Sequence, residues 1–471
     1  MRKFLDTPYP SSYSNMNSTD EKMIQLGNRP VGRLLWEYSL PAVVGMLVMA
    51  LYNVVDRVFI GQVVGPEAIA GMALTFPIMN ITPAIGVLVG VGASARISIL
   101  MGQNNKPKAE VMLGNAATLT IINGAIYIAF FMVFIDPILR AFGAGDLTLP
   151  YARSYMLWVL PGLLLTNIAF GLNNVLRSTG YPQRAMMTMV IGAVCNVILD
   201  AIFVLWLGWG MVGAAIATDI SMAVSAWFVV AHFFRKNVVL AFKGGTFGLK
   251  LPVVMSIISL GAAPSVINVA SCLVNALINR SLADHGGDMA IGAAGVFVTV
   301  TSLVITVVLG ITMGLQPIVG YNYGAGKYHR VSRVFWIAVA VATVVCTAGW
   351  AVGMTIPDLV ARAFTSDDFL IETTVVCLRH AMWAFPIVGI QIISTTLFQS
   401  IGAPARAMIL SLARQVIFLI PLMLILSPMM GVEGVWMSFP ISDILATVVT
   451  FILIIPVLRR LKRQSAISPL S

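Results

Sequence analysis

Charged residues are scarce in this chain of 471 residues. Only 10% are Asp, Glu, Lys or Arg, whereas 58% are hydrophobic, and the mean hydropathy is +0.91. A soluble domain carries roughly a quarter charged residues. The composition therefore excludes an ordinary soluble protein and indicates a polytopic membrane protein.

Cysteine, histidine and nucleotide-binding motifs are also scarce. Cys195, Cys272, Cys346 and Cys377 all lie within apolar stretches, which favours buried free thiols over a disulfide framework or a CxxC metal site. No GxxxxGKS/T motif occurs, and none of the four histidines belongs to an HExxH motif. We therefore expect neither ATP-driven transport by this chain alone, nor an enzyme, nor a cofactor.

Long apolar runs dominate what remains. Each is at least about 18 residues long, which is enough to span the hydrocarbon of a bilayer. They cover residues 34–60, 67–101, 110–135, 151–176, 185–207, 211–235, 251–283, 290–320, 331–356, 370–398, 407–427 and 432–458. The sequence thus predicts an all-α membrane protein with twelve transmembrane helices. Residues 1–33 read as a polar tail without a cleavable signal peptide.

The basic residues fall on one side of these spans. With the N-terminus inside, the inside regions hold 21 of the 29 Lys and Arg residues, whereas the outside loops hold only Arg140, Arg153 and Arg362. The positive-inside rule then predicts a membrane protein with both termini in the cytoplasm. The net charge of +10 is accordingly a topology signal, and we expect no nucleic-acid partner.

The two halves of the chain resemble each other. Pro41 and Arg57 match Pro264 and Arg280 at an offset of 223, and "RSTGYPQRAM" (177–186) reads against "QSIGAPARAM" (399–408). Six spans in each half make the repeats parallel. We predict an N-lobe over 34–236, a cytoplasmic linker over 237–250, a C-lobe over 251–460 and a C-terminal tail over 461–471. The two lobes should face a central cleft.

Carboxylates within spans are costly and usually functional. Asp56, Asp200 and Thr218 lie at a comparable depth, roughly 8–12 Å below the outer face, and Asn196 shares a helix face with Asp200. Such a cluster suits proton transfer, and its oxygens could also hold a hard monovalent cation such as Na⁺. A purely structural alternative is that Asp56 only forms an ion pair with Arg57. The second half of the chain argues against this alternative. Arg280 is the counterpart of Arg57, but the residue before it is Asn279 and not an aspartate.

Other polar positions leave their roles open. Asn268, Ser271, Asn275 and Asn279 form a stripe along the seventh span that either lines a cavity or bonds between helices. Asp219, Asp443, Arg379 and Arg414 receive no assigned role. Methionines that reach the cleft would suit weakly discriminating recognition of bulky apolar ligands. We take Met49, Tyr52, Asn275 and Asn279 as candidate cleft residues.

Several segments taken together resemble the MATE (multidrug and toxic compound extrusion) transporters, in the prokaryotic branch of DinF-like and MepA-like proteins. They are "SLPAVVGMLVMALYNVVDRVFIGQVVG", "LRSTGYPQ", "NVILD" and "GAAIAT". The resemblance covers about residues 30 to 460 and implies an antiporter of the inner membrane that exports bulky, often cationic organic compounds in exchange for H⁺ or Na⁺.

By position, the resemblance implies a cation site at Asp56, Asn196, Asp200 and Thr218, with Asn173 as a weaker member. Pro41 would be the proline about which the first span bends. The tenth span departs from the NorM-like branch, because Val388 stands where an Asp would be expected, so a second cation site in the C-lobe is not implied.

We predict that transport proceeds by alternating access of the two lobes. We expect the protein to be a monomer in contact with membrane lipid. A lipid-linked saccharide flippase of the same superfamily is the main alternative, although such proteins tend to have a cationic cavity. An intramembrane enzyme and a channel are further alternatives.

Overall fold

The computed structural model describes residues 18–63, 66–141, 143–146 and 148–467, and the regular elements of this part of the chain are helical. In chain order the longer helices are α1 (Ser18–Asn28), α2 (Val31–Val63), α3 (Pro66–Gly102), α4 (Lys106–Ala141), α5 (Leu149–Ser178), α6 (Pro182–Asp200), α7 (Gly210–Phe233), α8 (Leu251–Gly324), α9 (Tyr328–Thr355), α10 (Pro357–Arg362), α11 (Asp368–Ala381), α12 (Val388–Ser400), α13 (Pro404–Leu412), α14 (Ile420–Met430) and α15 (Val432–Ile467). The greater part of the predicted N-terminal tail, and the Arg57 side chain, lie outside the described residues.

The helices accommodate the predicted spans. Among the described residues, 10 helices are long and apolar enough to cross a membrane, with α8 counted once. A further span comes from α11 and the residues Phe385–Ser400, which are bent by 50° where they meet. At 1.5 Å per residue the 74 residues of α8 would extend over about 110 Å, far beyond a bilayer.

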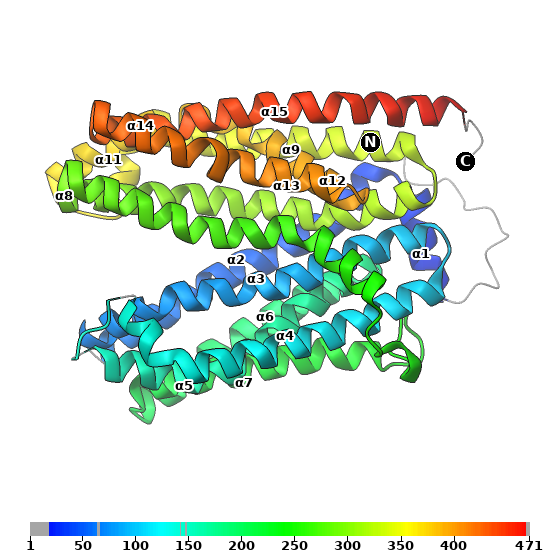
Figure 1. Cartoon of the computed structure of the whole chain (residues 1–471), viewed down its shortest axis with the longest axis horizontal. Helices are drawn as coiled ribbons and strands as arrows, with labels where there is room; N and C mark the ends of the chain where they lie inside the picture. The colour runs from blue at the N-terminus through cyan, green and yellow to red at the C-terminus, as the bar shows by residue number, and fades with distance from the viewer. Residues whose placement is uncertain (1–17, 64–65, 142, 147, 468–471) are drawn as a thin grey trace, which may run out of the picture.

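Gly287 divides α8 into two membrane-spanning legs. Its φ of 63° and ψ of −162° are not helical, and only glycine adopts such a conformation readily. The turn at the left-hand end of α8 in Figure 1 is where the chain reverses. With both legs counted, the twelve-helix prediction is confirmed.

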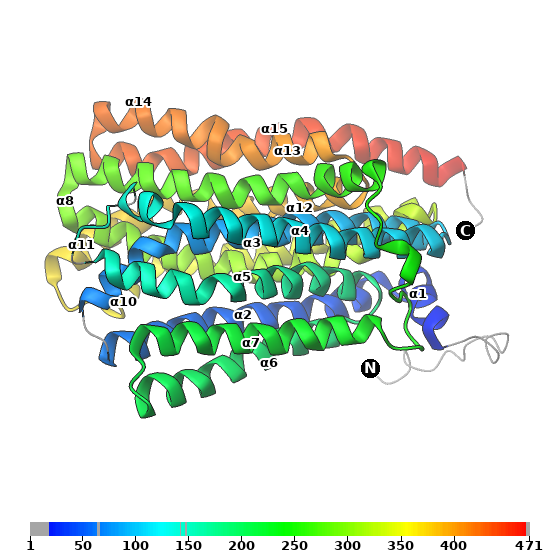
Figure 2. The same cartoon turned by 60° about the horizontal axis from the view of Figure 1, so that its bottom comes forward.

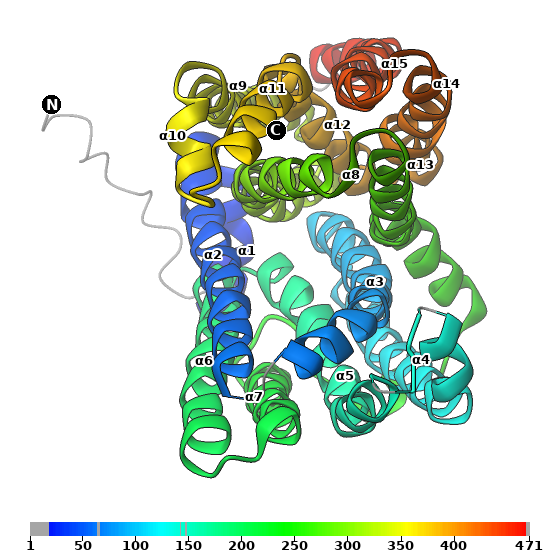
Figure 3. The same ribbon diagram turned by 90° about the vertical axis from the view of Figure 1, so that its left-hand side faces the viewer.

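The helices form two lobes. Figure 1 shows α2–α7 on one side of the molecule and α8–α15 on the other, and in the turned view of Figure 2 α14 and α15 lie along one edge and α6 and α7 along the opposite edge. The end-on view of Figure 3 shows α2 and α3 lying between the rest of the first lobe and α8. We call these bodies the N-lobe and the C-lobe.

The two lobes are packed together at the end that carries the termini. One buried hydrophobic cluster includes residues of both lobes, among them Leu26, Val89, Ile257 and Leu315. A second cluster, which includes Ile78, Tyr127 and Met211, belongs to the N-lobe alone and lies toward the opposite end of its helices. In Figure 1 the ribbons of the two lobes diverge toward that opposite end.

Glycines allow the close approach of the lobes. A side chain at Gly92 of α3 would collide with the backbone of Ile257 in α8, and one at Gly261 would collide with the backbone of Leu88. Ser39 Oγ of α2 also donates to the Ile311 carbonyl at 3.4 Å. Backbone thus packs on backbone where the lobes meet.

Helix α1 lies within the segment that the sequence predicted to be a tail, and it completes this junction. Asn322 Nδ2 donates to the Leu26 carbonyl at 3.0 Å, and Arg330 donates to the carbonyls of Leu26 and Arg29 at 3.2 and 2.5 Å. Leu26 is fully buried. The helix is therefore fastened to the C-lobe.

Candidate functional site

Two carboxyl groups meet inside the N-lobe. Asp56 lies on α2, and Asp200 is the last residue of α6, directly before a π-helical turn at Ala201–Trp206. The two side chains lie within hydrogen-bonding range of each other, and Asp200 is fully buried. No other described group donates to either Asp200 oxygen. Two carboxyl groups this close in a buried site cannot both ionise cheaply.

Asn196 and Thr218 lie beside this pair. Asn196 is buried one helical turn before Asp200, and its Nδ2 donates to Thr218 Oγ1 of α7 at 3.3 Å. Asn196 Oδ1 is buried without a donor among the described residues. The structure thus brings Asp56, Asn196, Asp200 and Thr218 together from three helices. A set of carboxyl, amide and hydroxyl oxygens has the chemistry to bind a proton or a hard monovalent cation.

The sequence reasoning missed Tyr155. It lies on α5, is 1% exposed, and is within electrostatic range of Asp56, Asp200 and Asp219. Its hydroxyl is the kind of group that can pass a proton between carboxylates. A tyrosine in an apolar run gave no signal of its own, because many such residues only pack.

Asp219 also belongs to this region. A side chain at Gly162 of α5 would collide with its carboxylate, and Asp219 Oδ1 is buried without a donor among the described residues. The sequence left its role open. Its position one residue after Thr218 places it on a neighbouring face of α7.

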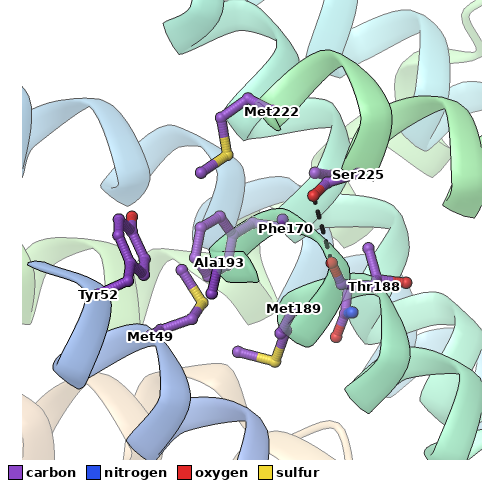
Figure 4. A pocket seen from close by; sticks show the side chains of 11 residues that line it. Met49, Tyr52, Phe170, Thr188, Met189, Ala193, Met222 and Ser225 are labelled. Atoms are coloured by element: carbon purple, nitrogen blue, oxygen red, sulfur yellow. Dashed lines mark hydrogen bonds between the residues drawn. The ribbon is translucent and has the colours of Figure 1, made fainter. Parts of the chain in front are cut away.

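A small apolar cavity opens further along the same helices. It has a volume of about 20 Å³, which is room for about one water. Met49 and Tyr52 of α2 face Phe170, Met189 and Met222 around it (Figure 4). Ser225 Oγ donates to the Thr188 carbonyl at 3.2 Å along one wall. The two N-lobe cleft candidates therefore lie together, in a setting rich in methionine.

Asn173 lies in the wall of this cavity and away from the aspartates. Its Nδ2 donates to the Ala185 carbonyl at 2.7 Å, and its Oδ1 accepts from Arg177 Nη2 at 2.7 Å. Ala185 is about 22 Å along α6 from Asp200. Arg177 falls between the predicted spans 151–176 and 185–207, where the sequence predicts an inside loop, but it is buried in the last turn of α5. The structure does not bring Asn173 to the carboxyl pair.

The remaining candidates lie apart from the cavity. Asn275 and Asn279 are exposed on one face of α8, in the other lobe. Pro41 lies inside α2, which continues as a helix through it. Neither asparagine contacts the N-lobe cavity as the described residues are arranged.

The C-lobe arranges its buried charge differently. Asp443 of α15 is buried, and its Oδ1 accepts a hydrogen bond from Arg414 Nε at 2.6 Å. Gln415, next to Arg414, accepts from Ser271 at 3.1 Å. Val388 is fully buried at the start of α12. The C-lobe carboxylate is thus held by a cation.

A family model decides the identity of the fold. The model named MatE matches this chain twice, over residues 41–202 and 264–425. The chain belongs to the MatE family. Members of this family are transporters and not enzymes. The two MatE matches begin 223 residues apart, at Pro41 and Pro264, which confirms the internal duplication.

MatE relatives cover almost the whole chain. The FAD transporter of Shewanella oneidensis is 28% identical over 90% of this chain and 94% of its own length. The multidrug export protein MepA of Staphylococcus aureus is 26% identical over 92% of this chain and 96% of its own. A multidrug resistance MATE family transporter solved in an outward-facing conformation is 26% identical, with a TM-score of 0.87 over 94% of this chain and 99% of the solved one. The chain is therefore similar to multi-pass multidrug efflux transporters.

Proposed function

We propose that this protein is a secondary active antiporter that exports bulky, often cationic organic compounds in exchange for H⁺ or Na⁺. The observation that carries the proposal is the buried pair of Asp56 and Asp200, with Asn196 and Thr218 beside it. Two like-charged groups cannot both ionise cheaply in a buried site. The pair therefore holds a proton or another cation, and a change in its surroundings releases it.

Substrate and ion compete through the shared helices in this proposal. Asp56 and Tyr52 are both on α2, and Asp200 and Met189 are both on α6. A movement of α2 that widens the cavity alters the carboxyl pair as well. Binding of either ligand then shifts the equilibrium between two states by its differential affinity for them. Pro41, which leaves one backbone carbonyl of α2 without its helical donor, is the place where we expect α2 to bend.

The orientation follows from the positive-inside rule. The end of the molecule that carries the termini is then cytoplasmic, and it is the end at which α1, α2, α3 and α8 join the lobes. This arrangement corresponds to a state closed toward the cytoplasm of the inner membrane. The exposed Asn275 and Asn279 would line the outer cleft, because an asparagine facing lipid is costly.

Transport of a fluorescent organic cation in proteoliposomes tests the proposal. Wild type, Asp56→Asn and Asp200→Asn are compared under an imposed H⁺ or Na⁺ gradient. Asp146→Asn, at a carboxylate whose side chain is 91% exposed, is the matched control. We expect one gradient to drive dye movement in the wild type and control, and neither aspartate variant to respond. Gradient-driven movement at the wild-type rate in Asp200→Asn would remove the coupling role.

A second candidate substrate comes from the Shewanella relative, which is an FAD transporter. FAD carries a negatively charged pyrophosphate, whereas the cavity described here lies between helices that bear Asp56, Asp200 and Asp219. We therefore favour cationic and neutral compounds. Uptake of FAD by the same proteoliposomes, at a rate that exceeds uptake of the dye, would reverse this preference.

A further inference from the structure

A basic pocket lies at the end of the N-lobe that carries the termini, outside the site described above. Its volume is about 410 Å³. Four of its lining residues are cationic: Lys22, Arg184, Arg235 and Lys236. Tyr181, Asn237 and Val238 complete the lining. The transport site uses none of these side chains.

The cations in this pocket come from three separate segments. Lys22 is on α1, Arg184 is in the first turn of α6, and Arg235 and Lys236 follow the end of α7. Within the described part of the chain, no carboxylate forms an ion pair with any of the four. Like charges held together without a counterion repel each other, so the fold keeps them close at a cost in stability.

Two of the cations lie near the ring of the same aromatic residue, Tyr181. Lys22 Nζ lies 3.8 Å from the centroid of the Tyr181 ring, and the Arg184 guanidinium carbon lies 5.5 Å from it. Arg184 Nη1 also donates to Nδ1 of the buried His232 at 2.7 Å. Burial, together with the charge of Arg184, lowers the pKa of Lys22. A pre-ordered group of donors is thus present before any ligand binds.

His232 holds Arg184 from behind the pocket lining. An arginine has no acceptor atom, so Nδ1 of His232 must accept from Arg184, and the ring proton is then on Nε2. His232 Nε2 is buried without an acceptor among the described residues. The His232 ring packs on Tyr181 with the centroids 4.5 Å apart.

We propose that this pocket binds the phosphate group of an anionic ligand. Arginine and lysine recognise phosphate by charge-assisted hydrogen bonds, and basic pockets between transmembrane helices bind anionic lipid headgroups. Phe234 is 66% exposed and Trp227 is 71% exposed on the same face of α7, as expected of aromatic residues at a lipid boundary. The phosphate belongs either to a lipid of the adjacent leaflet or to a soluble compound.

A ligand bound in this pocket would link elements on both sides of the junction of the lobes. The ligand would join α1, the start of α6 and the linker that leads into α8. Since α1 is itself fastened to the C-lobe through Arg330, a bound phosphate would stabilise the arrangement described here. The proposal does not depend on the ion or the compound that the protein transports.

The test uses the purified full-length protein. Native mass spectrometry counts bound phosphatidylglycerol against phosphatidylcholine, and thermal unfolding in detergent is followed with inorganic phosphate against chloride at equal ionic strength. The variant Arg235→Gln/Lys236→Gln removes two exposed cations of the pocket, whereas Arg459→Gln/Arg460→Gln removes two exposed cations elsewhere on the same side. The exposure of all four side chains keeps folding intact.

We expect the pocket variant to weaken binding of the phosphate-bearing ligand about tenfold or more, and the control variant to leave it unchanged. Selective binding of phosphatidylglycerol without an effect of inorganic phosphate identifies a lipid headgroup as the source. Stabilisation by inorganic phosphate identifies a soluble ligand. If neither binds, or if the control variant loses as much as the pocket variant, the proposal is wrong.

Discussion

The two lobes share one helical plan but treat their buried carboxylates in opposite ways. In the C-lobe, Asp443 accepts from Arg414 at 2.6 Å. In the N-lobe, Asp200 faces Asp56, and no cation forms an ion pair with Asp200 among the described residues. A permanent partner fixes the charge of a carboxylate, whereas a second carboxyl group leaves room for an exchangeable proton or cation. The comparison supports our proposal that the N-lobe is the lobe that couples an ion to transport.

Each lobe has a π-helical turn next to its buried charged residues. In the N-lobe the turn Ala201–Trp206 follows Asp200 directly, and in the C-lobe the turn Ala413–Leu419 contains Arg414 itself. π-Helical turns often mark functional sites, because they shift side chains out of the regular helical register. In each lobe the irregular turn thus lies beside the buried charge.

The largest effect is expected from breaking the C-lobe pair. Arg414→Met leaves Asp443 buried without a partner, which lowers the free energy of unfolding by about 3–5 kcal/mol. Thermal unfolding in detergent measures this. The double variant Arg414→Met/Asp443→Leu should recover most of the loss, because no buried charge remains. A single variant as stable as the wild type would mean that the pair is not the fixed charge that we describe.

A somewhat smaller effect is expected at the junction of the lobes. Arg330→Ala removes the hydrogen bonds that Nη2 of this charged group donates to the carbonyls of Leu26 and Arg29, and we expect the loss of the group to cost about 1.5–3 kcal/mol in all. The population with separated lobes should rise about tenfold or more. Maleimide labelling of Ser98→Cys, in a background without the four native cysteines, reports the opening.

The matched control for this experiment is Arg333→Ala, because Arg333 is exposed and forms no ion pair within the described residues. Its labelling rate should equal that of the parent. Equal rates for Arg330→Ala and Arg333→Ala would show that Arg330 does not hold the lobes together.

Removal of the N-lobe carboxylate should not lower the stability of the protein, in contrast to the breaking of the C-lobe ion pair. Asp200→Leu introduces the residue found at Leu422, its counterpart in the repeat. Since a buried carboxyl without a cation costs stability, the free energy of unfolding should stay the same or rise by about 1–2 kcal/mol. Gradient-driven transport should disappear. A loss of stability as large as that of Arg414→Met would contradict the distinction between the lobes.

The smallest effect is expected in the cavity. Met222→Ala removes a soft side chain from its wall, and dye affinity should fall about two- to fivefold. Met408→Ala, in the C-lobe, should leave the affinity unchanged. Fluorescence anisotropy of the bound dye measures both. Equal losses would show that the effect of Met222→Ala is not specific to the N-lobe cavity.

Most of the helical plan could be predicted from the sequence. Hydropathy alone places the start of α8 at Leu251 and divides it near Gly287, because apolar length is what a bilayer selects. The 50° bend within the tenth span could not be predicted from hydropathy. The hydropathy of the residues around Pro386 is the same whether the helix is straight or bent. The helical character of Ser18–Asn28 was also missed, because its stability comes from packing against the C-lobe.

The candidate site could be predicted only in part. Asp56, Asn196, Asp200 and Thr218 stand out because polar groups are rare within spans. Tyr155 does not stand out. Asn173 stands out as a polar residue, but in the structure its side chain bonds to Arg177 and to the Ala185 carbonyl and does not join the carboxyl pair. Contacts between helices decide which polar groups meet, and the sequence contains them only as a pattern of spacings.

Proton release on substrate binding tests the central claim most directly. A pH indicator in weakly buffered detergent solution reports the protons released when tetraphenylphosphonium is added to the purified protein. In Na⁺-free solution a proton is the cation available to the carboxyl pair, and substrate binding is linked to its release, so the wild type should release about one proton per protein molecule. Asp200→Asn should release none while still binding the compound. Equal release by the two proteins would show that the exchanged proton belongs to another group, and the account would be wrong.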